Sequence, residues 1–184
     1  MKSKRYIFYF GALAVIIFYL VYLVYQNYGV GINASDVTEK IESVMPPYIS
    51  GSAETRYNTD MPMMTVDGYD YVGIIEIPSN KIKLPVYSAW NERIAKSVPC
   101  RYSGSIYNND MVIGGKNTEN NFGCLRIISP GDQVNIIDTT GHYYSFNVVS
   151  ITHNSNFDTE SFDNPLVLFS YLNDISKYIY VMCE

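Results

Sequence analysis

Few side chains in this chain of 184 residues are of the types that usually carry nucleophilic, redox or zinc chemistry. There are three cysteines, Cys100, Cys124 and Cys183, and two histidines, His142 and His153. No two cysteines have the Cys-x-x-Cys spacing of redox and zinc motifs, and two histidines are too sparse for a structural zinc site. In an oxidising compartment two of the thiols could pair and one would remain. We therefore expect no metal and no cofactor.

A long apolar segment near the amino terminus predicts a transmembrane helix. Residues 6–25 carry no charge, and a helix of that length would span roughly 30 Å of hydrocarbon. Three basic residues precede the segment and none follows it before Lys40, which predicts a cytoplasmic amino terminus and an extracytoplasmic remainder. A cleaved signal peptide fits less well, because the run is longer than a usual signal core. We predict a cytoplasmic tail at 1–5 and a membrane anchor at 6–28.

The chain beyond the apolar segment is acidic. All 18 Asp and Glu residues lie there, against 10 of the 13 Lys and Arg residues, so this part carries a net charge of −8. Such a balance argues against nucleic acid as a partner, because a phosphate backbone requires a basic surface. With 184 residues in total, the chain has room for the anchor and one domain large enough to bury a core without metals or disulfides.

A juxtamembrane region is predicted at 29–70, between the anchor and the domain. Within it, residues 34–44 place apolar side chains such as Val37 and Ile41 at helical spacing, which predicts a short amphipathic helix. The polar stretch 50–67 contains Gly and Pro and lacks sustained periodicity. We interpret that stretch as a spacer between the membrane and the domain.

The domain predicted at 71–184 is mainly β. Seven short runs rich in β-branched, aromatic and aliphatic residues favour a barrel or a sandwich. Gly141 predicts a hairpin between two of the runs, and residues 78–80 predict another turn. Residues 92–97 favour one helical turn, and 157–165 favour a loop. The predicted strands are 72–77, 82–87, 111–114, 133–138, 143–151, 166–170 and 178–182.

Several segments of this domain match the sequence pattern of one protein family, in its order and close to its spacing. Through these segments the chain resembles the sortases, which are cysteine transpeptidases of the cell surface. Each segment alone is a weak signal, and together they are specific. The segments are GIIEIP at 73–78, KLPVY at 83–87, PCRYSGS at 99–105, VIGGKN at 112–117, FGxL at 122–125, GDxV at 131–134 and GxxYxFxV at 141–148.

The resemblance implies an eight-stranded β-barrel and covalent acyl transfer. In this family a cysteine at the end of the seventh strand attacks a peptide carbonyl, and an arginine on the eighth strand steadies the oxyanion. A histidine donates a proton to the leaving amine, and Lys116 stands at its position here. Expected partners are an extended sorting-signal peptide, another sortase or a surface protein. Cys100 and Cys183 lie at positions where related sequences can carry cysteine. A disulfide between these two residues is therefore an open question at the level of sequence.

Two registers are possible at the carboxyl end. In the first, 166–171 is the strand that normally ends in the nucleophile and 178–183 is the final strand, so Tyr171 replaces the cysteine and Tyr178 replaces the arginine. In the second, 178–183 is the nucleophile strand and Cys183 is the nucleophile. The first register is favoured, because the second lacks the last strand and leaves a barrel edge unpaired.

In the first register all three catalytic residues are exchanged. A phenol with a reference pKa near 10 ionises far less than a thiol near 8.5, so Tyr171 is a poor nucleophile. Tyr178 lacks the charge and the forked donors of an arginine. We therefore expect a catalytically inactive cell-surface protein that binds a peptide or a partner. The alternatives are an active transpeptidase that uses Cys183, and a new dyad in which the Lys116 ammonium lowers the pKa of Tyr171.

Overall fold

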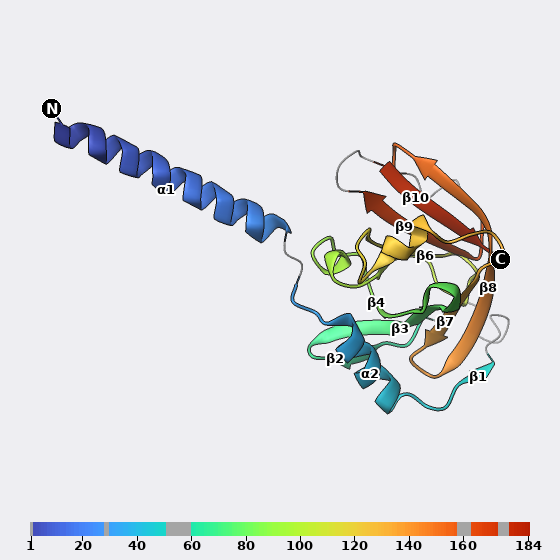
Figure 1. Ribbon diagram of the computed structural model, residues 1–184. Coiled ribbons are helices and arrows are strands. Elements are labelled where there is room, and N and C mark those ends of the chain that lie inside the picture. Colours follow the sequence, from blue (N-terminus) through green and yellow to red (C-terminus); the bar gives the residue numbers. More distant parts are fainter. Residues whose placement is uncertain (1, 28–29, 51–59, 158–162, 173–176) are drawn as a thin grey trace.

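A long helix and a β-rich domain make up the computed structural model of the chain (Figure 1). The structure describes residues 2–27, 30–50, 60–157, 163–172 and 177–184. Its α-helices are α1 (Lys2–Asn27) and α2 (Ala34–Val44), and short 3-10 helices are η2 (Pro78–Asn80), η3 (Ile94–Lys96) and η4 (Phe122–Arg126). The strands are β1 (Ile49–Ser50), β2 (Met64–Val66), β3 (Tyr69–Ile77), β4 (Ile82–Tyr87), β5 (Cys100–Ser103), β6 (Met111–Lys116), β7 (Gln133–Asp138), β8 (His142–Asn154), β9 (Leu166–Leu172) and β10 (Lys177–Cys183).

Eight of the described strands close into a barrel. Neighbouring strands follow the order β8, β10, β9, β6, β5, β4 and β3. β7 pairs with both β3 and β8, and it thereby joins the two ends of that order. β1 and β2 add to the outside of the ring, on β8 and β3 respectively. The prediction of a mainly β, eight-stranded barrel is confirmed.

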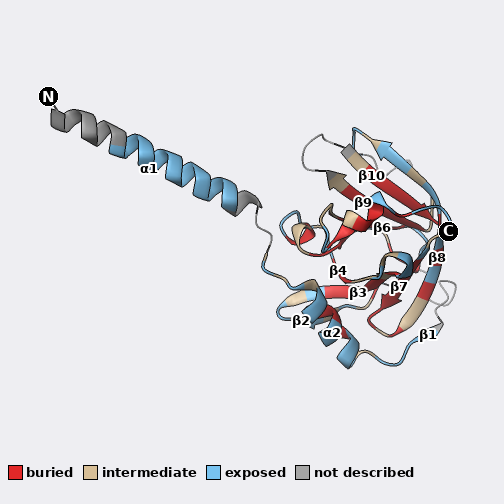
Figure 2. Cartoon of the chain, in the orientation of Figure 1, coloured by how far each residue is buried: buried red, intermediate tan, exposed pale blue. Residues whose placement is uncertain are grey.

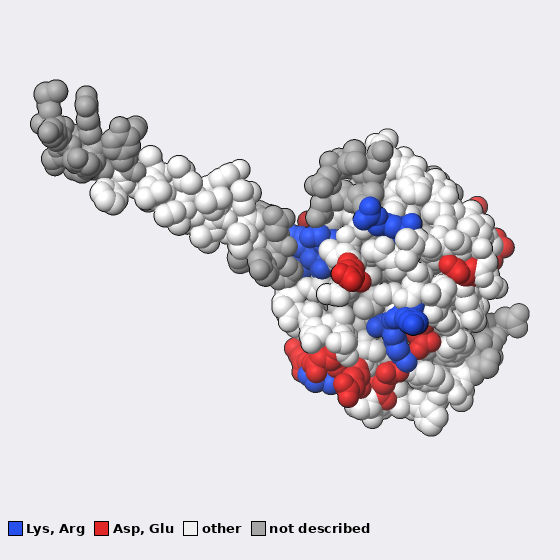
Figure 3. All heavy atoms as spheres, in the orientation of Figure 1, with Lys and Arg blue, Asp and Glu red and all other residues white. Residues whose placement is uncertain are grey.

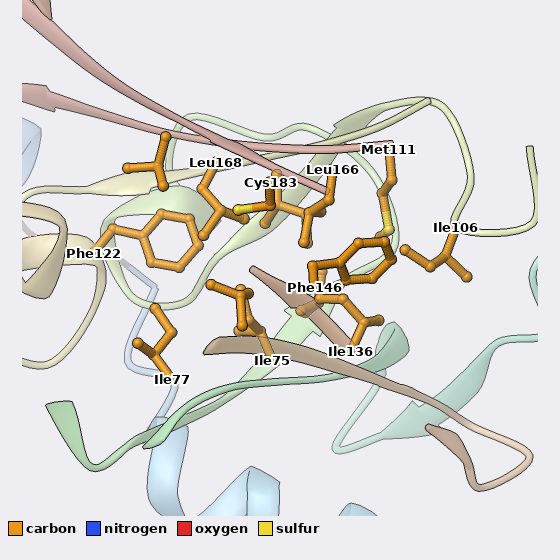
Figure 4. Packing of buried hydrophobic residues seen from close by; sticks show 14 of the residues in the cluster. Ile75, Ile77, Ile106, Met111, Phe122, Ile136, Phe146, Leu166, Leu168 and Cys183 are labelled. Carbon is orange, nitrogen blue, oxygen red and sulfur yellow. The ribbon is translucent and has the colours of Figure 1, made fainter. Parts of the chain in front are cut away.

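The core fills the interior of the barrel. Alternate residues of a strand point to opposite faces, and those that point inward pack together as aliphatic and aromatic side chains (Figure 4). A second group covers the outer face of β6, β9 and β10, and we call it the outer cluster. Its members are Val112, Val167, Phe169, Tyr180 and Met182.

The predicted spacer is corrected by the structure. Residues 51–59 lie outside the described residues, but Met61 is buried in the barrel core and β2 pairs with β3. α2 also packs Val37 and Ile41 against the barrel, in one cluster with Ile74 of β3. The folded domain therefore begins before the predicted boundary at residue 71, because these apolar side chains are buried by contact with the barrel.

Exposed ion pairs add to the contact between α2 and the barrel. The Nζ of Lys83 on β4 contacts the carboxylates of Glu42 and Glu76, the latter at 2.8 Å. The Nζ of Lys40 lies 2.8 Å from Asp67, in the turn after β2. Acidic and basic side chains lie side by side on this face (Figure 3). Because exposed pairs contribute only about 0–1 kcal/mol each, the buried apolar face of α2 is the main contact.

The helix α1 begins at Lys2, so the predicted cytoplasmic tail is part of the helix. Side chains 10–24 are exposed at every position (Figure 2). Many of them are large and apolar, including Phe10 and Phe18. Among the residues that the structure describes, no helix is both long enough and apolar enough to cross a membrane.

A buried carboxylate supports the hairpin between β7 and β8. Asp138 is fully buried, and its two oxygens accept hydrogen bonds from the Tyr107 hydroxyl at 2.7 Å and the Thr140 hydroxyl at 2.6 Å. The backbone N–H groups of Thr140 and His142 donate to the same carboxylate at 2.8 and 3.0 Å. Burial raises the pKa of Asp138, but these hydrogen bonds outweigh burial and the net pKa is lowered.

Replacing Asp138 with asparagine is therefore expected to lower the free energy of unfolding by about 2 kcal/mol at pH 7, the typical range for hydrogen bonds to a charged group. Because the folded pKa is depressed, this contribution is complete above the unfolded value of about 3.9 and is lost as pH falls through the folded pKa. Urea unfolding at pH 7 and at pH 3 measures the difference. Asp70→Asn, at an exposed carboxylate, is the matched control, and an equal loss in both variants would contradict the prediction.

Candidate functional site

The structure brings Lys116, Tyr171 and Tyr178 together at one end of three neighbouring strands. β6 and β9 are parallel, and Lys116 is the register partner of Tyr171. β9 and β10 are antiparallel, and Tyr178 is the register partner of the same Tyr171. Each of the three residues lies an even number of positions from a member of the outer cluster on its own strand. Their side chains therefore share the outer face of the barrel.

Cys183 lies elsewhere. Its register partner on β9 is Leu166, five positions from Tyr171, which corresponds to roughly 17 Å along a strand. Its side chain points into the barrel core beside Leu168 and Phe122 (Figure 4). Burial raises the pKa of this thiol to about 12, so it is neither accessible nor ionised at neutral pH. The structure thus separates Cys183 from Lys116 by both distance and face.

The other two cysteines are also buried free thiols. Cys100 belongs to a cluster outside the barrel core that includes Tyr71 and Ile74, whereas Cys183 belongs to the barrel core. Cys124, on η4, is in the barrel core as well. Cys100 and Cys183 therefore do not form the disulfide that the sequence leaves open. Among the described residues, no group of His, Cys, Asp and Glu could hold a metal ion.

The electrostatics of Tyr171 oppose its use as a nucleophile. Burial raises the pKa of its phenol to about 12, and the nearby Glu92 carboxylate adds to the increase. At that value about one molecule in 10⁵ carries a phenolate at pH 7. The structure describes both Tyr171 and Lys116, and no hydrogen bond joins them. A Lys116–Tyr171 dyad would require a lowered pKa at Tyr171, whereas burial raises it.

A pocket of about 440 Å³ opens on the outer face beside Tyr171 and Tyr178. This volume lies within the range of about 300–1,000 Å³ that is typical of ligand pockets. We call it the aromatic pocket, because six of its eight lining side chains are aromatic and the other two carry opposite charges. It is lined by Trp90, Glu92, Lys96, Tyr102, Phe157, Phe169, Tyr171 and Tyr178.

Edge-to-face and tilted contacts between rings build the wall of the aromatic pocket. Phe169 lies at the centre, with ring centroids of Phe157, Trp90 and Tyr102 at 5.1, 5.4 and 5.6 Å. Such distances are typical of favourable aromatic pairs. Gly114 on β6 makes room for the Phe169 ring, because a Cβ at that position would lie 2.1 Å from its Cζ atom. The close approach of ring and strand therefore requires glycine.

A buried hydrogen bond fixes the strand end that carries Tyr171. The Ser170 hydroxyl donates to the backbone oxygen of Gly115 at 3.0 Å and is fully buried. It lies on the inner face, opposite to Tyr171, and it links β9 to β6 beside the register pair of Lys116 and Tyr171. The backbone at the site is therefore held by side-chain and ladder hydrogen bonds together.

Sequence reasoning missed most of the aromatic pocket. It placed Tyr171 and Tyr178, but Trp90, Tyr102 and Phe157 received no functional assignment. Lys116 lies on the same face but does not line the pocket. One sequence signal could have indicated the pocket. Aromatic residues are spaced by two along β9 and along β10, and this spacing places their rings on one face.

Comparison with solved structures identifies the fold. The chain is similar to Clostridium perfringens sortase C with the C-terminal cell wall sorting motif, with a TM-score of 0.57 and 19% identity over 82% of this chain and 96% of that one. It is similar to Streptococcus agalactiae sortase C1, with a TM-score of 0.55 and 15% identity over 81% and 83% of the two chains. It is also similar to Listeria monocytogenes sortase A, with a TM-score of 0.52 and 15% identity over 62% and 86%.

In sequence, no family model and no curated protein matches the chain. The structural likeness is nevertheless extensive, since it covers 82% and 81% of this chain in the two sortase C comparisons. At identities below 20% this likeness establishes the architecture and leaves the chemistry to the residues themselves. The domain has the β-barrel fold of the sortases.

Proposed function

We propose that this chain is a membrane-anchored, extracytoplasmic pseudo-sortase that binds a peptide or a protein partner and does not catalyse acyl transfer. One observation carries the proposal. The strand ends that the sequence resemblance assigns to the reactive residues of a sortase lie on one face, beside a pocket, and they hold Lys116, Tyr171 and Tyr178.

The residues at this site supply the nucleophile and the oxyanion contact of acyl transfer poorly. The transfer needs an ionisable nucleophile, a proton donor for the leaving amine and a donor group for the oxyanion. The pKa of about 12 leaves Tyr171 protonated. Tyr178 offers the oxyanion one neutral hydroxyl where an arginine would offer a fixed charge and several donors. Cys183 points into the core, and Cys100, the register partner of Gly114, is a buried thiol whose pKa burial raises to about 12.

The apolar helix supports the anchoring part of the proposal. In the sequence, residues 6–25 form an uncharged, mainly apolar run. The structure describes the side chains at positions 10–24 of this run, and all of them are exposed. A helix with apolar side chains on all sides is stable in a bilayer and unfavourable in water. The basic residues before the run favour a cytoplasmic amino terminus. The acidic domain would then lie outside the cell.

The aromatic pocket supports the binding part of the proposal. It lies beside Tyr171 and Tyr178, and the similar Clostridium perfringens sortase C was solved with a C-terminal cell wall sorting motif. We propose that the pocket of this chain takes an extended peptide segment, either a sorting signal or a segment of another sortase or surface protein. Loss of turnover would convert such a site from a catalyst into a receptor.

The alternative of an active transpeptidase that uses Cys183 has less support. Its thiol would have to leave the barrel core and reach the outer face. That movement would break the β10 ladders to both β8 and β9, which hold the last strand in the barrel.

Incubating the full chain in detergent micelles with sorting-signal peptides and an amine acceptor is therefore expected to give no cleaved peptide and no acyl-enzyme adduct by mass spectrometry. Saturable peptide binding is expected in the same samples. Turnover that disappears in Tyr171→Phe or in Cys183→Ala would overturn the proposal. Tyr48→Phe, at an exposed tyrosine outside the pocket, controls for unspecific effects.

A further inference from the structure

We propose that the aromatic pocket recognises a proline-rich segment in the polyproline II conformation, with a basic residue at one end. The inference rests on the peptide-binding function proposed above and names the class of peptide. It is argued from the hydrogen-bonding character of the lining side chains, from the packing of their rings and from the positions of the two charges.

The lining side chains are rich in free hydrogen-bond donors. The Trp90 indole N–H and the hydroxyls of Tyr102, Tyr171 and Tyr178 form no hydrogen bond with other described residues. Indole is a donor only, and a hydroxyl can donate one bond. Glu92 is the one lining side chain that can only accept when ionised. A suitable ligand therefore offers many acceptors and few donors.

A proline-rich segment has this composition. Proline lacks the backbone N–H and keeps its carbonyl. The polyproline II helix forms no internal hydrogen bonds, so its carbonyl groups are available to an outside donor. A peptide without proline would bring backbone N–H groups, for which the pocket offers the Glu92 carboxylate and hydroxyl oxygens that also act as donors. The difference favours proline-rich peptides over other extended peptides.

The ring packing provides flat apolar surfaces for proline side chains. The ring centroids of Trp90 and Tyr102 lie 5.5 Å apart with their planes at 69°, and those of Phe157 and Tyr178 lie 5.2 Å apart. Tyr102 and Phe157 are exposed although each contacts other rings. Aromatic-lined grooves of this kind are a recurring mode of polyproline II recognition, because the ligand is preformed and loses little entropy on binding.

The charges at the pocket orient such a segment. Glu92 and Lys96 lie four residues apart on the segment that includes η3, and both line the pocket. The Glu92 carboxylate favours a basic residue at one end of the ligand. A small organic cation is a weaker candidate, because Lys96 would repel it within the same pocket. The net charge of −8 beyond the apolar segment also favours a basic ligand.

Trp90 makes the inference directly testable, because it is the only tryptophan of the chain. The full chain in detergent micelles is titrated with a peptide of six prolines and one lysine, blocked at both ends. A matched peptide carries six alanines and the same lysine. We expect the proline peptide to change Trp90 fluorescence saturably and to bind at least about tenfold more tightly than the alanine peptide.

Variants locate the binding site. Tyr102→Ala is expected to weaken the proline peptide about tenfold or more, whereas Tyr48→Ala, the same change outside the pocket, leaves its affinity unchanged. Two proline peptides are compared for the charge: one carries six prolines and a lysine, and the other carries six prolines and a terminal alanine. The first is expected to bind the unchanged chain more tightly, and Glu92→Gln is expected to remove this difference in affinity. Equal weakening by Tyr102→Ala and Tyr48→Ala would overturn the proposed site.

The outcomes separate this inference from the proposed function. Equal affinity for the proline and alanine peptides, or binding of the sorting-signal peptide with no response to the proline peptide, would overturn the inference and leave peptide binding intact. A response to tetramethylammonium without a response to the proline peptide would also overturn it. Absence of binding by every peptide would overturn the proposed receptor function as well.

Discussion

Replacing Gly73 with alanine is expected to destabilise the barrel by about 4 kcal/mol or more, through positive-φ strain and a backbone clash combined. Gly73 has φ of +155°, and a Cβ added to it would lie 2.0 Å from the backbone oxygen of Ile137. The obstacle is backbone and cannot rotate away. It also lies between β3 and β7, where the ring of strands closes. Since domains are stable by only about 5–15 kcal/mol, this variant is expected to be largely unfolded at moderate urea concentrations.

Two other glycines provide matched controls. Gly131 has φ of +93° with nothing within 4 Å of an added Cβ, so Gly131→Ala introduces backbone strain without a clash. Gly31 has open space and no positive φ, so Gly31→Ala introduces neither. Urea unfolding followed by circular dichroism should give the order Gly73→Ala, Gly131→Ala, Gly31→Ala, with the largest loss first. A loss in Gly73→Ala no larger than in Gly131→Ala would refute the clash.

The second large effect is expected at the outer face. Phe169→Ala should lower the free energy of unfolding by about 3–5 kcal/mol, the usual cost of truncating a buried phenylalanine. The side chain of Phe169 is 1% exposed and its ring contacts Trp90, Tyr102, Phe157 and Tyr180. Removing the ring leaves a cavity against Gly114, which has no side chain to fill it.

Phe157→Ala is the matched control for that prediction. Phe157 belongs to the same group of rings but is 39% exposed, so its truncation is expected to cost about half as much or less. Thermal unfolding of both variants measures the difference. Equal losses would mean that the outer cluster does not depend on burial of the central ring.

Much of the fold could be predicted from local sequence, and the exceptions have physical causes. The helix at 34–44 and the strands at 82–87 and 133–138 appear with the predicted bounds, because their apolar spacing is regular. β5 escaped prediction, since Cys100–Ser103 is short and ends in exposed, polar positions. β2 escaped because it is only three residues long and its segment contains Pro62 and lacks sustained periodicity.

The site could be predicted only in part. The motif pattern located positions 116, 171 and 178, and strand pairing then placed them side by side. The aromatic pocket depends on Trp90 and Phe157, which approach β9 from the loops that follow β4 and β8. Local patterns carry no information on such approaches. The burial that raises the pKa of Tyr171 likewise depends on the assembled fold.

The parallel pairing of β6 with β9 and the Ser170 hydroxyl together determine where positions 116 and 171 meet. Neither of these contacts uses the side chain at position 116 or at position 171. New side chains can be installed at the three strand ends without rebuilding the framework, which makes this barrel a ready template for grafting reactive groups.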